Sequence, residues 1–288
     1  MVWKSFVNGI RQMLSYKRVL LIFYLVNLAA GLIVTMPMWS LLGRFAGHSL
    51  SGAELARRVD FDFISEFLKH STDGLAADLA LLLVVAVLYW IVQLFLSGGA
   101  LAVYHSGQPY RPELFWSGAG RYFLRFIRLA LWALPVFLIV FVLHYLEKGL
   151  ERLIFGADPY EYVWYWGGWV RIGLRYLGFV LYLMVLDYAR IYAVLTDERR
   201  MRVAVWRGVR FVAGNFWATL GLALLLFAAG WIGWGVFRIL AVQLSSPVTG
   251  VILAMFVWQQ LFMIFRMGLQ LSRYSGEMIL YKWRSGML

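Results

Sequence analysis

The sequence has no cysteine and few charged residues. Without cysteine, disulfides, thiolate nucleophiles and cysteine-based metal sites are excluded. Charged residues make up 15% of the 288 residues, whereas soluble domains contain about 25%. In their place the chain has 62% hydrophobic and 18% aromatic residues. A soluble fold cannot bury so much apolar surface, and disordered chains are poor in aromatics. The composition therefore predicts an integral membrane protein.

The sequence also lacks the short motifs of common enzyme classes. No P-loop, HExxH sequence or dinucleotide-binding fingerprint occurs in it. Glu66 and His70 stand one helical turn apart, with Asp62 a turn earlier, but one histidine with two carboxylates is a weak metal-binding pattern. The apolar residues between them favour an amphipathic helix at the membrane surface. We therefore expect no enzymatic activity, no cofactor and no metal site.

The charges that are present are mostly positive and give a formal net charge of +12. In a soluble protein this excess would indicate nucleic-acid binding. In a membrane protein it is typical of loops that face the cytoplasm and of attraction to anionic lipid head groups. We therefore expect membrane lipids as partners and no nucleic acid.

Long apolar stretches predict how often the chain crosses the membrane. A helix needs about 20 mainly apolar residues to cross the hydrocarbon core. Six stretches reach that length, and no strand-like alternation is present. They are Val19–Leu42, Leu79–Tyr104, Ile127–Leu146, Gly173–Leu195, Phe216–Leu240 and Val248–Ser272.

Loop charge predicts the orientation of these six spans, which place both termini on one side. Lys and Arg are concentrated on the side of the termini, and most acidic residues lie on the other side. By the positive-inside rule the termini are cytoplasmic, and we expect a multi-pass protein of the bacterial cytoplasmic (inner) membrane. The basic segments are 1–18, 105–128, 197–215 and 273–288.

Three basic, aromatic stretches precede the odd-numbered spans, and each has a Trp near its start. In the first, the apolar residues from Trp3 to Leu14 share one helical face. The others are Leu114–Arg128 and Val203–Asn215. Such helices lie in the headgroup plane. The sequence thus predicts one all-α membrane domain of six transmembrane helices. They form three pseudo-repeated hairpins, each preceded by a cytoplasmic interfacial helix, with repeat units of about 1–105, 106–197 and 198–288.

Ionisable residues inside the predicted spans are the main functional signal. Asp187 and Arg190 lie one turn apart in the fourth span, and Arg266 lies at a similar depth in the sixth. Each charge costs about 2.5–3.5 kcal/mol at the centre of a bilayer. We therefore expect these side chains to face the interior of the bundle, with Asp187 paired to Arg266, Arg190 or both.

Polar and small residues accompany the predicted charge cluster. Ser97, Gly98 and Gly99 occupy the corresponding region of the second span, where small side chains allow close helix approach or leave a void. Gln259 adds hydrogen-bonding capacity nearby. Two interpretations follow. The cluster is either a clasp that fixes helix packing, or a net positive site for an anionic substrate such as a lipid phosphate.

The chain resembles two groups of membrane proteins. The stretch DYARIYAVLTDERR (Asp187–Arg200) and the interfacial helix after it are similar to uncharacterised bacterial six-helix proteins related to the membrane domain found beside glycerophosphodiester phosphodiesterases. The phosphodiesterase domain itself is missing, so its chemistry is not implied. The layout is also similar to six-helix permeases of ABC exporters, which begin with an interfacial helix but lack a three-fold repeat.

These observations lead to one functional expectation and two alternatives. The protein is expected to be a non-enzymatic transport or membrane-assembly subunit that handles a lipid or another amphiphile. The first alternative is the permease of an ABC-type exporter, which requires a separate ATPase docked on Leu114–Arg128 or Val203–Asn215. The second is a structural subunit of a larger membrane complex. A homo-oligomer or a membrane-complex partner is compatible with each.

Overall fold

The structure is a computed structural model that describes residues 1–46, 61–70, 72–156, 160–244 and 248–287. Almost all of these residues are helical, and none of them forms a strand. Three helices are short: α1 (Val2–Ser15), α4 (Phe61–His70) and α8 (Met201–Gly214). Six are long: α2 (Lys17–Ala46), α5 (Thr72–Ser106), α6 (Pro112–Phe155), α7 (Glu161–Leu195), α9 (Phe216–Gln243) and α10 (Thr249–Ser285).

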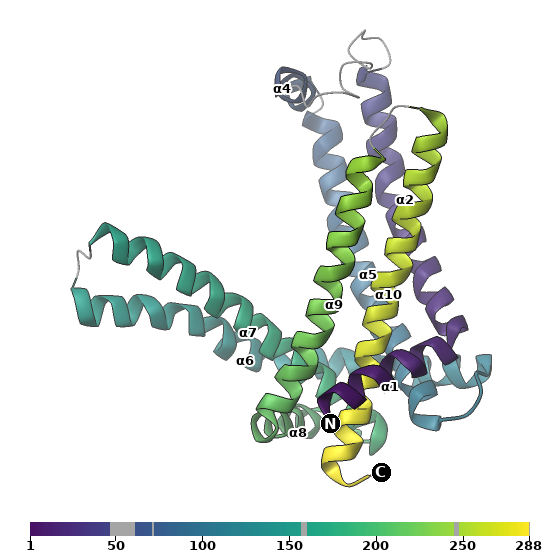
Figure 1. Cartoon of the computed structure of the whole chain (residues 1–288), viewed down its shortest axis with the longest axis vertical. Coiled ribbons are helices and arrows are strands. Elements are labelled where there is room, and N and C mark those ends of the chain that lie inside the picture. Colours follow the sequence, from purple (N-terminus) through teal and green to yellow (C-terminus); the bar gives the residue numbers. More distant parts are fainter. Residues whose placement is uncertain (47–60, 71, 157–159, 245–247, 288) are drawn as a thin grey trace. The chain divides into compact units, whose positions relative to one another are not determined.

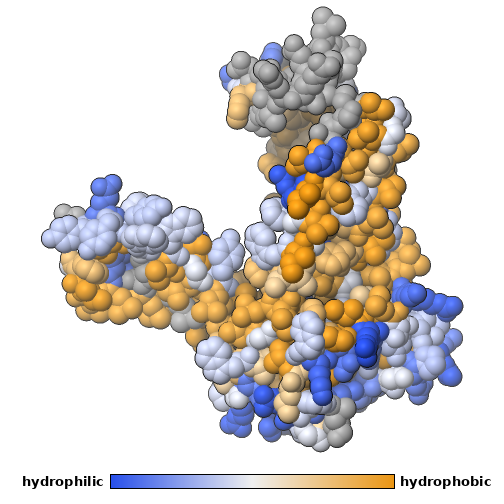
Figure 2. Space-filling model, viewed as in Figure 1, coloured by the Kyte–Doolittle hydropathy of each residue, from blue (hydrophilic) through white to orange (hydrophobic). Residues whose placement is uncertain are grey.

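All six long helices are long and apolar enough to cross a membrane. Each covers one of the predicted spans, the sixth except for its first residue, Val248, so the prediction of a multi-pass all-α membrane protein is confirmed at this level. Apolar side chains cover the surface of the long helices, whereas hydrophilic residues gather around α1, α8 and the C-terminal end of α10 (Figure 2). This distribution suits helices whose middle parts contact hydrocarbon.

The chain divides into two compact units that cut across the three predicted repeat units. Unit 1 contains residues 1–15, 97–228 and 270–288, and unit 2 contains residues 16–96 and 229–269. In unit 1, α6 and α7 form an antiparallel pair, and α8 packs against both (Figure 1). Most fully buried large side chains belong to this unit, including Tyr104, Phe115, Phe126 and Tyr188.

Short side chains allow close helix contacts in unit 1. A Cβ atom on Gly99 would lie 2.7 Å from the carbonyl oxygen of Phe115, and one on Gly98 would lie 3.1 Å from the Cβ of Tyr122. These residues join the C-terminal end of α5 to the start of α6. Of the two roles predicted for the small residues after Ser97, close approach is therefore the one observed, since the space is filled.

Unit 2 is held together by polar pairs between its long helices. The Tyr24 hydroxyl of α2 donates a hydrogen bond to Gln260 Oε1 of α10 at 3.0 Å. The Tyr89 hydroxyl of α5 donates one to Asn27 Oδ1 of α2, also at 3.0 Å. Among apolar helices such pairs fix rotation and depth, because an unpaired hydroxyl or amide in hydrocarbon is unfavourable.

One of the predicted interfacial stretches is not a separate helix. A turn at Tyr16 separates α1 from α2, and another at Asn215 separates α8 from α9. By contrast, Leu114–Arg128 forms the first turns of α6, which continues unbroken to Phe155. The residues directly after Arg128, 129–134, contain no glycine or proline, so nothing stops the helix there, and α6 also continues through Pro135.

Candidate functional site

The candidate site is a cluster of two acids and two arginines in unit 1, where the last turns of α7 meet the C-terminal third of α10. Asp187 is 4% exposed, accepts a hydrogen bond from Arg190 and forms an ion pair with Arg273. Arg190 Nη1 lies 3.2 Å from Asp187 Oδ1, and Arg273 Nε lies 3.2 Å from Asp187 Oδ2. Glu277, 3% exposed, completes the cluster one turn after Arg273. We call these four residues the charge cluster.

Aromatic rings from four helices surround the charge cluster. The Arg190 guanidinium lies over the Phe126 ring of α6, with its carbon 5.9 Å from the ring centroid. Tyr188 packs against Phe211 of α8 at 4.9 Å, and Phe211 packs against Tyr281 of α10 at 4.4 Å between centroids. The rings exclude water from Asp187, so its two ion pairs lie in a medium of low polarity, where they are strong and costly to break.

Several buried polar atoms next to the charge cluster lack a hydrogen-bond partner among the described residues. They include Glu277 Oε2, the Tyr188 hydroxyl and the Ser272 hydroxyl. All three side chains are almost completely buried. Buried polar groups in folded proteins are nearly always paired, so a group of unpaired ones beside charges indicates a place for a ligand, a proton or water.

Among the residues of the charge cluster, Arg273 has the most surface exposed to the surroundings of the protein. The Arg273 side chain keeps 32% of its surface exposed, compared with 11% for Arg190. Its guanidinium also lies over the ring of Tyr274, 5.5 Å from the centroid. Arg273 can therefore contact Asp187 and still present N–H groups to a molecule at the protein surface.

The connection between α7 and α8 is a second polar arrangement, at the exposed end of unit 1. Asp197 follows α7 with a φ angle of +51°, a left-handed conformation that Asp tolerates better than most residues. Its carboxylate accepts from Arg121 and, at 2.6 Å, from Arg125, both on α6. The hydrogen bond from Arg125 is the main cause of the lowered pKa of Asp197. Glu198 then accepts from the backbone N–H groups of Arg199 and Arg200, where α8 begins.

The structure brings together only some of the predicted site residues. Asp187 and Arg190 are paired, as predicted. Ser97 is buried at the start of the α5 segment that belongs to unit 1. Arg266 and Gln259 belong to unit 2 and are exposed.

The inward orientation predicted for Arg266 is therefore wrong. The arginine of α10 that meets Asp187 is Arg273, because the helix continues to Ser285 and does not leave its helical path near Ser272. Sequence reasoning also missed Glu277. The spacing of Arg266, Arg273 and Glu277 at i, i+7 and i+11 was the available signal, since it places all three on one helical face.

The weak metal pattern of the first outer loop lies partly outside the described side chains. Residues 61–70 form α4, a helix of 10 residues. The side chains of Asp62 and His70 are not among those described. Within the described part of the chain, no group of three metal-ligating side chains is found.

Comparison of the chain with protein-family models, with curated proteins and with solved structures finds no match.

Proposed function

We propose that the protein is a non-enzymatic subunit for transport or membrane assembly in the bacterial cytoplasmic membrane, and that it handles a lipid or another amphiphile. The observation that carries this proposal is the charge cluster. Ionisable groups within membrane-spanning helices are costly, and they usually mark a substrate or ion pathway. The unpaired polar atoms of Glu277 and Ser272 support a binding role, because in a purely structural clasp these atoms would form hydrogen bonds within the protein.

The surface of α1 supports an interfacial position with the termini in the cytoplasm. This helix buries Ser5, Gly9 and Met13, and Gly9 approaches the backbone of Gly276 closely. The residues it leaves exposed include Trp3, at 62%. A helix that packs on the protein through Ser5 and Gly9 and leaves Trp3 and Leu14 exposed is suited to lie against lipid.

A similar distribution on α8 supports the proposed pseudo-repeat. α8 buries Ala204, Gly208 and Val212 against unit 1 and leaves Trp206 exposed among arginines. We propose that the three hairpins with their preceding stretches are related units. In the second repeat unit, about 106–197, the interfacial stretch is continuous with its spanning helix, α6.

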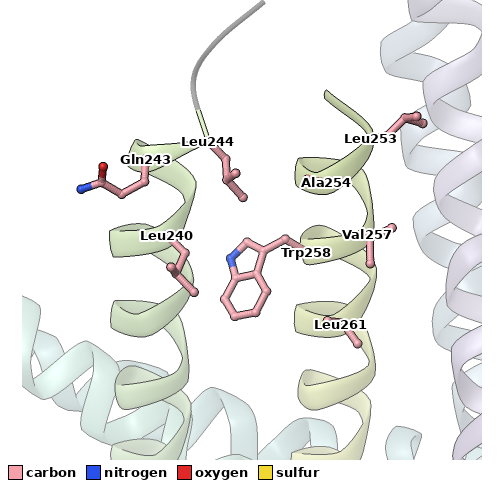
Figure 3. A pocket seen from close by; sticks show the side chains of 8 residues that line it. All are labelled: Leu240, Gln243, Leu244, Leu253, Ala254, Val257, Trp258 and Leu261. Carbon is pink, nitrogen blue, oxygen red and sulfur yellow. The ribbon is translucent and has the colours of Figure 1, made fainter. Parts of the chain in front are cut away.

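An apolar groove in unit 2 supports an amphiphilic ligand. The groove lies between the outer halves of α9 and α10, has a volume of about 480 Å³, and is open on one side. Trp258 projects from α10 into the space between the helices (Figure 3), and its indole N–H donates to the Phe237 carbonyl at 3.3 Å. Apolar clefts with few polar groups are typical of sites for hydrophobic ligands, and an acyl chain fits this lining.

Lipid retention tests the proposal. The full-length protein is purified from membranes in mild detergent, and bound phospholipid is measured by native mass spectrometry. Wild type is expected to retain phospholipid, and Arg273→Gln to reduce retention about tenfold or more, since one charge-assisted contact contributes roughly 1.5–3 kcal/mol. Arg284→Gln, on the exposed end of the same helix, is the matched control and should retain lipid like wild type.

A charge exchange separates binding from a structural clasp. The double variant Asp187→Arg with Arg273→Asp keeps an opposite pair across α7 and α10 but moves the positive charge away from the accessible position. Loss of lipid with preserved folding supports the proposal. Full lipid retention in the exchanged variant would show that the pair only fastens the helices, and the proposal would be abandoned.

A further inference from the structure

Glu277 differs from the other members of the charge cluster. Both arginines of the cluster are paired with Asp187, and no ion pair of the described residues includes Glu277. Its side chain is 3% exposed, and its Oε2 atom has no hydrogen-bond partner among the described residues. A carboxylate removed from water without a cation in contact is strongly disfavoured, and such groups bind a proton instead.

The proton on Glu277 decides the net charge of the cluster. With Glu277 ionised, two acids balance two arginines. With Glu277 neutral, Asp187 alone faces Arg190 and Arg273, and the cluster has an excess of one positive charge. An anion at the accessible side of Arg273 is then favoured, because the local positive charge is no longer compensated.

We propose that Glu277 is a proton-binding site, and that its protonation is coupled to the binding of a phosphate group beside Arg273. Glu277 takes up one proton from water when the phosphate binds and returns it when the phosphate leaves, so no other reactant is needed. This inference rests on the proposed function, and it adds the substrate class, a phosphate-bearing molecule, and a dependence on pH.

The groups that face Glu277 make this coupling local. The charged groups that interact electrostatically with Glu277 are the acid Asp187 and the arginines Arg190 and Arg273. Arg207 of α8 interacts electrostatically with Tyr281, which follows Glu277 by one turn on α10. A phosphate adds negative charge near Arg273 and so stabilises the protonated acid. By reciprocity, protonation strengthens phosphate binding by the same factor.

Infrared spectroscopy tests the proton site directly. Full-length protein in nanodiscs of phosphatidylcholine is titrated from about pH 5 to about pH 9 while the C=O stretch of protonated carboxylic acid is followed. We expect one such band near neutral pH in wild type and in Glu113→Gln, an exposed glutamate used as control, and its absence in Glu277→Gln. A band that persists unchanged in Glu277→Gln overturns the inference.

A binding experiment tests the coupling and identifies the source of the phosphate. Nanodiscs containing phosphatidylglycerol, and protein in phosphate-free maltoside micelles with added inorganic phosphate, are compared by lipid enrichment and by calorimetry. Wild-type affinity for the phosphate probe should fall by up to about tenfold per pH unit on the alkaline side, because one proton accompanies each ligand. Glu277→Gln, which mimics the protonated acid, should bind with no such pH dependence. A response in only one of the two arms identifies whether the phosphate belongs to a lipid or is free.

The outcomes separate this inference from the proposed function. Lipid retention with the same pH dependence in wild type and Glu277→Gln overturns the coupling and leaves the proposed function standing. If the acid band is lost in Glu277→Gln but wild type binds neither phosphate probe, the coupling is also contradicted. If wild type in addition retains no lipid, the proposed function is contradicted too.

Discussion

The pairing of Asp187 with Arg273 leads to a quantitative prediction. Asp187→Asn removes the shared partner of two arginines, and breaking a buried ion pair by deleting one member typically costs about 3–5 kcal/mol. Arg190 has little exposed surface, but Arg273 is about one-third exposed and can turn toward water. We therefore expect the lower end of the range, a decrease of about 3 kcal/mol in the free energy of unfolding.

Equilibrium unfolding in mixed micelles, followed by the helical circular-dichroism signal, measures this decrease. Arg273→Gln should also destabilise the protein, and its double variant with Asp187→Asn should show a coupling energy of at least about 1 kcal/mol. The matched control is Arg266→Gln on the same helix, which should change stability by no more than about 0.5 kcal/mol because its side chain is exposed. An equal or larger loss in Arg266→Gln than in Arg273→Gln would refute the assignment of Arg273 to the cluster.

Three further predictions concern unit 1. Gly9→Val should detach α1 from α10, because a Cβ atom there lies 2.9 Å from backbone atoms of Gly276; protease sensitivity of the N-terminus should rise in this variant and stay unchanged in Gly120→Ala, which has open space around it. The lowered pKa of Asp197 means that its stabilising contribution is present above the unfolded-state pKa of about 3.9 and disappears as the pH falls through the lower folded-state value. Asp197→Asn should thus cost at most about 1 kcal/mol at neutral pH, since the carboxylate is 40% exposed, and should equal wild type in strong acid. The absence of native cysteine allows a nitroxide label at Trp3→Cys or Arg11→Cys; Trp3→Cys should be more accessible to oxygen in lipid, Arg11→Cys to a water-soluble relaxant, and equal accessibility at both would contradict an interfacial α1.

Hydropathy was sufficient to predict the number of long helices but not their ends. About 20 apolar residues are enough to cross the hydrocarbon core, so hydropathy identifies the middle of each helix. It says little about where a helix stops once it has left the core. The predicted fourth span began at Gly173 and α7 begins at Glu161; the sixth was expected to end at Ser272 and α10 ends at Ser285. In the extension of α10, packing against other helices favours continuation, because Tyr274, Met278 and Tyr281 are buried. The extension of α7 leaves most of its aromatic side chains exposed.

The error at the charge cluster follows from those missing ends. Arg266 and Arg273 are seven residues apart on α10, almost two full turns, so they point in nearly the same direction and differ by about 10 Å along the axis. Periodicity predicted the correct face of the helix and the correct partner, Asp187. It placed the arginine too deep, because Arg273 was counted with the basic tail that follows the span. The same extension places Glu277 one turn further on this face, as its spacing from Arg266 indicates, and there it is buried. If the helix had ended at Ser272, Arg273 and Glu277 would be ordinary solvated charges; since α10 remains helical and packed against α7, Arg273 pairs with Asp187 and Glu277 is buried beside them.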